Sequence, residues 1–154
     1  MLFRSKEGLA DLTGYLMARG GIPSSPADEL DEELEFLAAR LSSNFGGLSG
    51  SVDLNLLSKD ADRGFEILRA VLAAPSFQDD KLMLRKTQEL QALKQRNDDS
   101  RNIESRERNF LAYGEVFWFN RHTTAASLES IRREDLLAFH HEWVHPRNFI
   151  VSIS

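Results

Sequence analysis

Residues 8–21 have the sequence GLADLTGYLMARGG, and this stretch predicts the first helix of the chain. Leu9, Leu12 and Leu16 are spaced three and four residues apart, so they fall on one face of a helix. The glycines at positions 20 and 21 then favour a stop, because glycine is a poor helix former. The three leucines would be core residues in any α+β domain, so we expect this helix to be buried.

A second helix is expected immediately after this stretch. Ser24 or Ser25 can cap it, and Pro26 suits its first turn. Acidic residues then fill its N-terminal end, where the helix dipole favours negative charge. Its expected apolar stripe consists of Leu30, Leu34, Leu37 and Leu41.

Strands are indicated by patterns further along the chain. Residues 45–48 are typical of a strand or strand-loop that two glycines weaken. Val52, Leu54 and Leu56 alternate with polar residues, which is typical of a half-buried strand. The apolar residues at 149, 151 and 153 alternate in the same way and predict a final strand.

The remaining sequence predicts a helix-rich chain. Asp60 can cap a helix that turns its apolar residues inward and ends before Pro75; these residues are Phe65, Leu68 and Leu72. Further helices are expected at about 79–96, 102–113, 125–130 and 133–145. The aromatic loop at 116–119 is expected to be buried, with a peptide-binding surface or an interface as the alternative. We therefore expect an α+β fold in which helices pack on a mostly antiparallel sheet of about three strands.

Composition argues against several classes of function. The chain has 154 residues, enough for one domain with a core, and a net charge of −5 without any block of Lys or Arg. A nucleic acid or an anionic membrane is therefore disfavoured as a partner. The absence of cysteine excludes disulfides, thiolate metal sites and a cysteine nucleophile. No apolar run approaches the length of a membrane span, and the composition fits periplasm and cytoplasm alike.

Residues 141–145 read His-Glu-Trp-Val-His, which matches the His-Glu-x-x-His motif of many zinc proteases. In a helix, this spacing would place both histidines on one face. A catalytic zinc also needs a third protein ligand and a bound water. The motif therefore raises the hypothesis of an active zinc metallopeptidase that uses His141, Glu142 and His145.

The surrounding sequence favours a solvated helix end instead. The apolar side of the expected helix carries Leu136, Phe139, His140, Trp143 and Val144. His141, Glu142 and His145 then fall on the solvent side, and Pro146 ends the helix. None of the nine residues after His145 is His, Asp or Glu. Histidines at this end would interact favourably with the negative pole of the helix dipole.

Residues 8–20 resemble the active-site helix of the pitrilysin/insulinase family of zinc metallopeptidases, which includes the mitochondrial processing peptidases. That helix reads approximately Gly-Leu-Ala-His-x-x-Glu-His-Met, the inverted zincin motif. Its two histidines and a distant glutamate hold zinc, and the glutamate inside the motif activates the zinc-bound water. The resemblance continues, in the family's order and spacing, through residues 24–41, 48–58, 59–77, 82–100 and 127–151.

The resemblance implies the family's fold without its chemistry. Asp11 stands where the first zinc-binding histidine should be, Gly14 replaces the general base, and Tyr15 replaces the second histidine. Ala92 stands where the distant glutamate should be. Of the three zinc ligands, only the one at Asp11 could remain. We therefore expect neither a bound zinc ion that acts as a Lewis acid nor a zinc-activated water. We therefore expect no catalytic residue, metal or cofactor of the chain's own.

Zinc-free versions occur in this family as second domains or partner subunits that pack against a catalytic half and close a chamber around a peptide. The resemblance therefore implies a catalytic peptidase domain or subunit as partner and a peptide in the assembled chamber; a homodimer is a further option. Only seven residues precede the helix at 8–20, where the family places the first strands of its sheet. Residues 1–154 are thus expected to be a single, partial domain with N-terminal strands missing. An α+β interaction module unrelated to peptidases is the remaining alternative.

Overall fold

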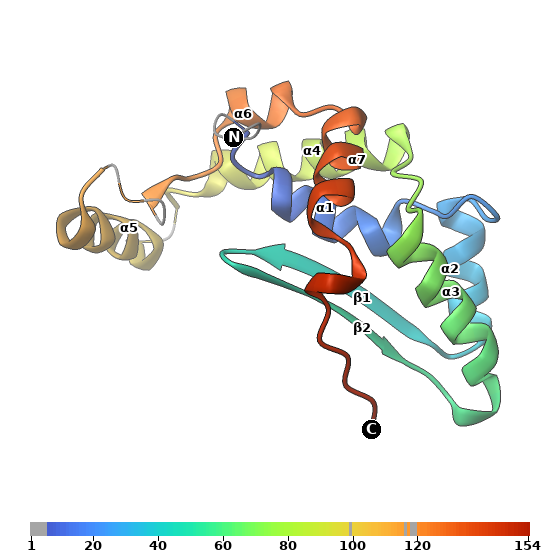
Figure 1. Ribbon diagram of the computed structural model, residues 1–154. Coiled ribbons are helices and arrows are strands. Elements are labelled where there is room, and N and C mark those ends of the chain that lie inside the picture. Colours follow the sequence, from blue (N-terminus) through green and yellow to red (C-terminus); the bar gives the residue numbers. More distant parts are fainter. Residues whose placement is uncertain (1–5, 99, 116, 118–119) are drawn as a thin grey trace.

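The computed structural model describes residues 6–98, 100–115, 117 and 120–154, which form helices packed on a small sheet (Figure 1). The elements are α1 (Leu9–Arg19), α2 (Ala27–Phe36), β1 (Arg40–Gly46), β2 (Ser49–Asn55), α3 (Ala61–Ala73), α4 (Asp79–Gln95), α5 (Ser100–Tyr113), α6 (Ala125–Ser130) and α7 (Arg133–Trp143), with 3-10 turns at Ser58–Asp60 (η1) and Pro146–Asn148 (η3). The predicted α+β class is confirmed. Among the described residues, no helix is long and apolar enough to cross a membrane.

The sheet is the antiparallel hairpin of β1 and β2. Leu41 pairs with Leu54 and Ser43 pairs with Val52, and the apolar members of these pairs pack into the core together with Phe45. The alternate positions are polar and exposed: Arg40, Ser42, Asn44, Ser51, Asp53 and Asn55. The hairpin therefore has one core-facing side, as its period-two pattern predicts, and one polar side that solvent reaches.

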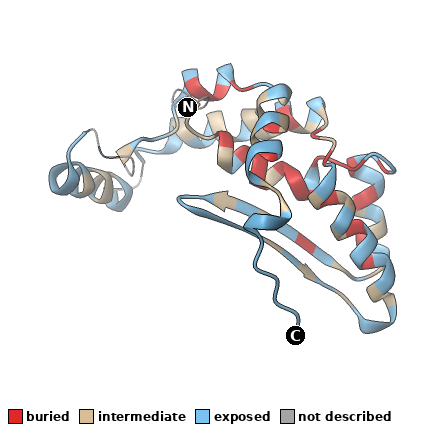
Figure 2. Ribbon diagram, viewed as in Figure 1, coloured by how far each residue is buried: buried red, intermediate tan, exposed pale blue. Residues whose placement is uncertain are grey.

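α1 lies at the centre of the core, as its leucine spacing predicts. Leu9, Leu12 and Leu16 are almost completely buried, and each such leucine stabilises the fold by about 1.5–3 kcal/mol. The helix contacts β1, α3, α4 and α7, and it lies between the hairpin and the outer helices in Figure 1. Figure 2 shows buried positions concentrated along α1 and almost absent from α5.

Long cationic side chains hold the ends of several helices. The Lys86 ammonium on α4 donates hydrogen bonds to the backbone oxygens of Glu129 (3.1 Å) and Ile131 (2.9 Å), at the end of α6. The Arg133 guanidinium on α7 donates to the backbone oxygens of Ser76 and Phe77, between α3 and α4. These contacts satisfy carbonyl groups at the end of α6 and in the segment between α3 and α4.

Two predicted helix faces are wrong. α2 ends at Phe36, and Ala38 adopts a left-handed backbone conformation (φ 48°) that turns the chain, so Leu41 belongs to β1 rather than to the helix stripe. On α3, Phe65 is 48% exposed, because the helix turns Gly64 toward the hairpin instead. A Cβ at Gly64 would lie 2.7 Å from a Leu56 methyl carbon, so a larger residue would require the Leu56 side chain to shift.

The predicted final strand is also absent. Residues 149–154 form no strand, and within the described residues β1 and β2 pair only with each other, so the sheet has two strands rather than three. Alternation alone could not supply the neighbouring strand edge that a strand needs. In the aromatic loop, Phe117 is exposed and stacks on Tyr113 (5.2 Å between ring centroids), so the predicted burial is wrong for Phe117. Positions 116, 118 and 119 lie outside the described residues.

Candidate functional site

The face of α1 that carries Asp11 and Tyr15 lies between the hairpin and α4. Asp11 is exposed, Tyr15 is half-buried and Gly14 is buried. From α4, the half-buried side chains of Arg85 and Glu89 reach the same place, because they are one helical turn apart. The four side chains of Asp11, Tyr15, Arg85 and Glu89 are called the α1–α4 cluster below.

Gly14 is held directly against the backbone of β1. A Cβ at this position would lie 2.3 Å from the Phe45 backbone nitrogen and 3.0 Å from the Asn44 carbonyl carbon. The Ser43 hydroxyl bridges the two elements: it donates to the Gly14 backbone oxygen and accepts a hydrogen bond from the Ala18 backbone N–H (3.1 Å). No side chain fits at position 14 while α1 packs in this way, so a general base is sterically excluded there.

Arg85 covers the aromatic ring of Tyr15. Its guanidinium carbon lies 4.0 Å from the ring centroid, and that of the exposed Arg19 lies 5.5 Å away. The Arg85 guanidinium also forms an ion pair with the Glu89 carboxylate. The position where the resemblance expects a metal-binding histidine is therefore occupied by a tyrosine that binds an internal cation.

Asp11 completes the cluster from the exposed side. Partial burial raises the pKa of the Asp11 carboxyl, the Glu89 carboxylate raises it further, and the Arg85 guanidinium acts in the opposite direction. Asp11 of α1 and Glu89 of α4 are thus carboxylates from different helices; Glu89 is ion-paired with Arg85, and the charge of Arg85 also acts on the Asp11 carboxyl.

Ala92 does not belong to the cluster. It is exposed on α4, three residues beyond Glu89, and has no atom that could bind a ligand. Sequence reasoning singled out Ala92 by its distance along the chain and missed Arg85 and Glu89. The available signal was the i, i+4 spacing of opposite charges, but such pairs are common on solvated helices.

The cluster does not fit a zinc ion. It offers the carboxylates of Asp11 and Glu89 and no imidazole, and the second carboxylate is already paired with Arg85. Across the residues that the structure describes, no group of three or more His, Cys, Asp or Glu side chains is arranged to hold a metal. Three protein ligands are the usual minimum for a catalytic zinc.

The histidines of the His-Glu-Trp-Val-His motif lie in two different backbone environments. α7 ends at Trp143, so the predicted continuation of this helix to His145 is wrong, and His145 has an extended backbone. His141 and Glu142 are exposed, as predicted, whereas Trp143 is 52% exposed instead of lying on the apolar side. The His145 ring lies 3.3 Å from the Asn148 side-chain nitrogen.

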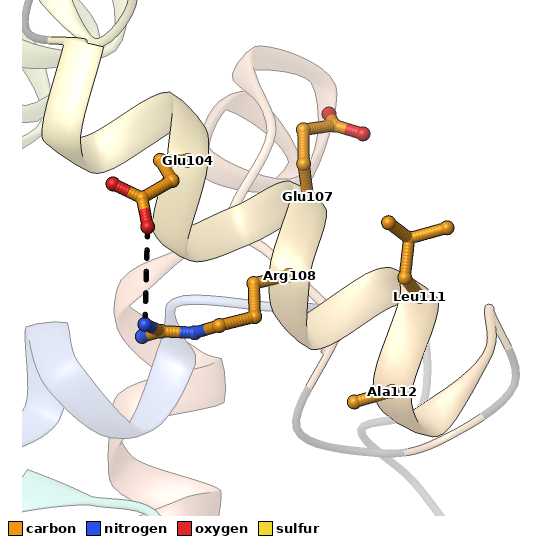
Figure 3. Close-up of a pocket in the computed structure, with 5 residues that line it drawn as sticks. All are labelled: Glu104, Glu107, Arg108, Leu111 and Ala112. Carbon is orange, nitrogen blue, oxygen red and sulfur yellow. Dashed lines mark ion pairs between the residues drawn. The ribbon is translucent and has the colours of Figure 1, made fainter.

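Two surface hollows are lined by residues outside the cluster. One, of about 390 Å³, is bounded by His145, Pro146 and Arg147. The other, of about 550 Å³, lies along α5 and is lined by Glu104, Glu107, Arg108, Leu111 and Ala112, with an ion pair between Glu104 and Arg108 (Figure 3). All five side chains of this second hollow come from a single helix, so it is part of an open surface.

Comparison with known proteins shows likeness in structure without likeness in sequence. No family model matches the chain, and no curated protein matches its sequence. Among solved structures, it resembles the peptidase M16 inactive domain from Pseudomonas fluorescens, with a TM-score of 0.79 and 22% identity over 90% of this chain and 34% of that one. This chain has the fold of an M16 peptidase domain.

A second solved structure with the M16-like fold is a mutant of the ferredoxin protease FusC in complex with Arabidopsis ferredoxin. Its TM-score is 0.72, with 17% identity over 87% of this chain and 15% of FusC. The chain therefore spans about a third of the first structure's length and less of the second. The resemblance that the α1 sequence suggested is confirmed at the level of the fold.

Proposed function

We propose that this chain is a zinc-free, non-catalytic M16-type peptidase domain or subunit that supports peptide binding and chamber assembly with a catalytic partner. The main supporting observation is the contact of Gly14 with β1, which leaves no room for a general base in the motif helix. The likeness to a solved M16 inactive domain supports the same conclusion.

The hairpin supports a role in peptide binding. In the described residues, β1 and β2 pair only with each other, so each strand presents one edge of unpaired backbone groups. An extended peptide can add to such an edge through backbone hydrogen bonds. The exposed polar side of the sheet would then line a water-accessible chamber.

Exposed apolar side chains support a protein partner. Leu48 at the hairpin turn is 89% exposed, and Ile150, Val151 and Ile153 beyond α7 are 100%, 76% and 78% exposed. Exposed apolar side chains such as these are typical of surfaces that another protein covers.

The first test is the zinc content and the hydrolytic activity of the purified, untagged chain. After equilibration with zinc and removal of free metal, elemental analysis should find almost none, and a quenched fluorescent peptide should remain uncleaved. One zinc per chain together with metal-dependent cleavage, both lost in His141→Ala, would instead identify an active metallopeptidase that uses His141, Glu142 and His145.

The second test is reconstitution with a catalytic M16 domain that carries an intact His-x-x-Glu-His motif. We expect a stable complex in light scattering and at least a several-fold gain in hydrolysis of the same peptide. A homodimer with no affinity for the catalytic domain would contradict the proposed partnership and would favour an interaction module unrelated to peptidases.

A further inference from the structure

We infer that Arg85 is a built-in cation that joins α4 to α1 at the place where the M16 motif helix would hold a metal ion, and that it keeps divalent cations out. This inference rests on the proposed function, because it explains how a zinc-free domain stabilises the region of its lost metal site. It assigns Arg85 a structural and metal-excluding role that the sequence resemblance does not contain.

Two contacts fix the position of the guanidinium. It lies over the Tyr15 ring of α1 at 4.0 Å, and it is ion-paired with Glu89 of α4. Its positive charge also opposes the rise in the pKa of the Asp11 carboxyl. Arginine suits this arrangement better than lysine, because a planar guanidinium can stack on a ring and pair with a carboxylate at once.

The buried Nε atom of Arg85 shows that charge and stacking determine this position. Within the described residues, Nε is enclosed by the protein and has no hydrogen-bond partner. A buried donor without a partner is destabilising. The contacts of Arg85 with the Tyr15 ring and the Glu89 carboxylate must offset that cost.

Asp11 and Glu89 would repel each other across the helix interface without this cation. The Glu89 carboxylate already helps to raise the pKa of Asp11. Arg19 also lies over the Tyr15 ring, but it is exposed and farther away, at 5.5 Å, so it cannot replace Arg85. A divalent ion that approached the two carboxylates would meet the positive guanidinium at short range, where like charges repel strongly.

The stability of the Arg85→Met variant tests whether Arg85 holds α1 and α4 together. Methionine keeps much of the apolar stem but removes the charge, and we expect the melting temperature to fall by about 3–8 °C. Arg85→Lys should lie between this variant and the wild type, because it keeps the charge and loses the planar contact. The matched control is Arg69→Met, an exposed arginine on α3, which should melt within about 1–2 °C of the wild type.

The change in melting temperature on adding divalent cations tests whether Arg85 keeps these ions out of the α1–α4 cluster. In a His141→Ala background, which removes one surface histidine, millimolar manganese or zinc should leave the parent protein's melting temperature unchanged. The same ions should raise that of Arg85→Met, because its two carboxylates are then free to share the added ion. Adding Asp11→Asn to Arg85→Met should abolish this response.

Different results would contradict the role of Arg85 and the zinc-free role of the domain. If Arg85→Met behaves like Arg69→Met in both experiments, Arg85 is an ordinary surface arginine, and the zinc-free role of the domain is unaffected. If the wild-type chain binds one zinc ion that His141→Ala removes, the proposed function is wrong and the exclusion at Arg85 is unaffected. If the His141→Ala protein with Arg85 in place is itself stabilised by the added ions, and Asp11→Asn abolishes that response, the exclusion is wrong.

Discussion

At Gly14 the sequence predicted part of what the structure shows, and at Arg85 it predicted nothing. The sequence alone showed that position 14 lacks a side chain, and this was enough to predict the loss of a general base. It could not show that the β1 backbone fills the space beside position 14. The Phe45 backbone nitrogen, which would lie 2.3 Å from an added Cβ, belongs to a residue about thirty positions further along the chain. Arg85 was missed for the same reason: its spacing to Glu89 is visible in the sequence, whereas its contact with Tyr15 is tertiary.

The Gly14 packing predicts a steep penalty for any added side chain. Gly14→Ala should lower the free energy of unfolding by about 1–3 kcal/mol, and Gly14→Glu should lower it further without creating activity. Urea unfolding measures both. Gly46→Ala is the matched control, since its Cβ would meet Asp11 at an ordinary 3.4 Å, and its effect should stay below about 1 kcal/mol. A Gly14→Ala protein as stable as the wild type would show that α1 can move away from β1.

Among the secondary-structure elements, the local patterns succeeded where the helix or strand carries its own signals. The leucines of α1, the alternation in β2 and the start of α4 at Asp79 are all where the sequence placed them. The wrong predictions concern where helices end and which strands pair. The left-handed turn at Ala38 diverts Leu41 into β1, and the apolar alternation at 149–153 has no strand beside it. Both outcomes depend on distant parts of the chain.

The ion pair between α2 and α3 provides a prediction at this scale. Arg63 donates two hydrogen bonds to the Glu33 carboxylate, at 2.6 and 3.0 Å, and these bonds lower the pKa of Glu33 below its ordinary value of 4.5. A lowered carboxyl pKa stabilises the folded state above the ordinary value, and the gain is lost as the pH falls through the lowered pKa.

Glu33→Gln should therefore destabilise the protein by about 0.5–1 kcal/mol at neutral pH, because the pair is partly exposed. The difference from the wild type should shrink below pH 4.5 and approach zero in stronger acid. Denaturant unfolding at several pH values measures this change. Glu35→Gln, an exposed neighbour on the same helix, should show neither effect. A difference between Glu33→Gln and wild type that stays constant with pH would contradict a role for the carboxylate charge.

On the scale of the whole molecule, burial is unevenly distributed. α1 is enclosed by the hairpin and three helices, whereas α5 has no buried residue and extends away from the body of the fold (Figures 1 and 2). Its Phe110, Leu111 and Tyr113 are exposed large hydrophobic residues. The sequence predicted α5 as a helix but could not show that none of its described residues is buried. Local helix propensity rarely stabilises an isolated helix of this length in water.

Hydrogen exchange should therefore rank the helices by burial rather than by length. α5 has 14 residues and α6 only six, but α6 buries Leu128 and is capped by Thr124 and Ser127. We expect the amides of α1 to be the best protected, those of α6 to be intermediate, and those of α5 to exchange fastest. If α5 is instead protected more than α6 in the chain alone, it must be covered by another copy. Protection of α5 that appears only after a catalytic M16 domain is added would place α5 in the interface, because a helix that buries no residue of its own gains most from an external partner.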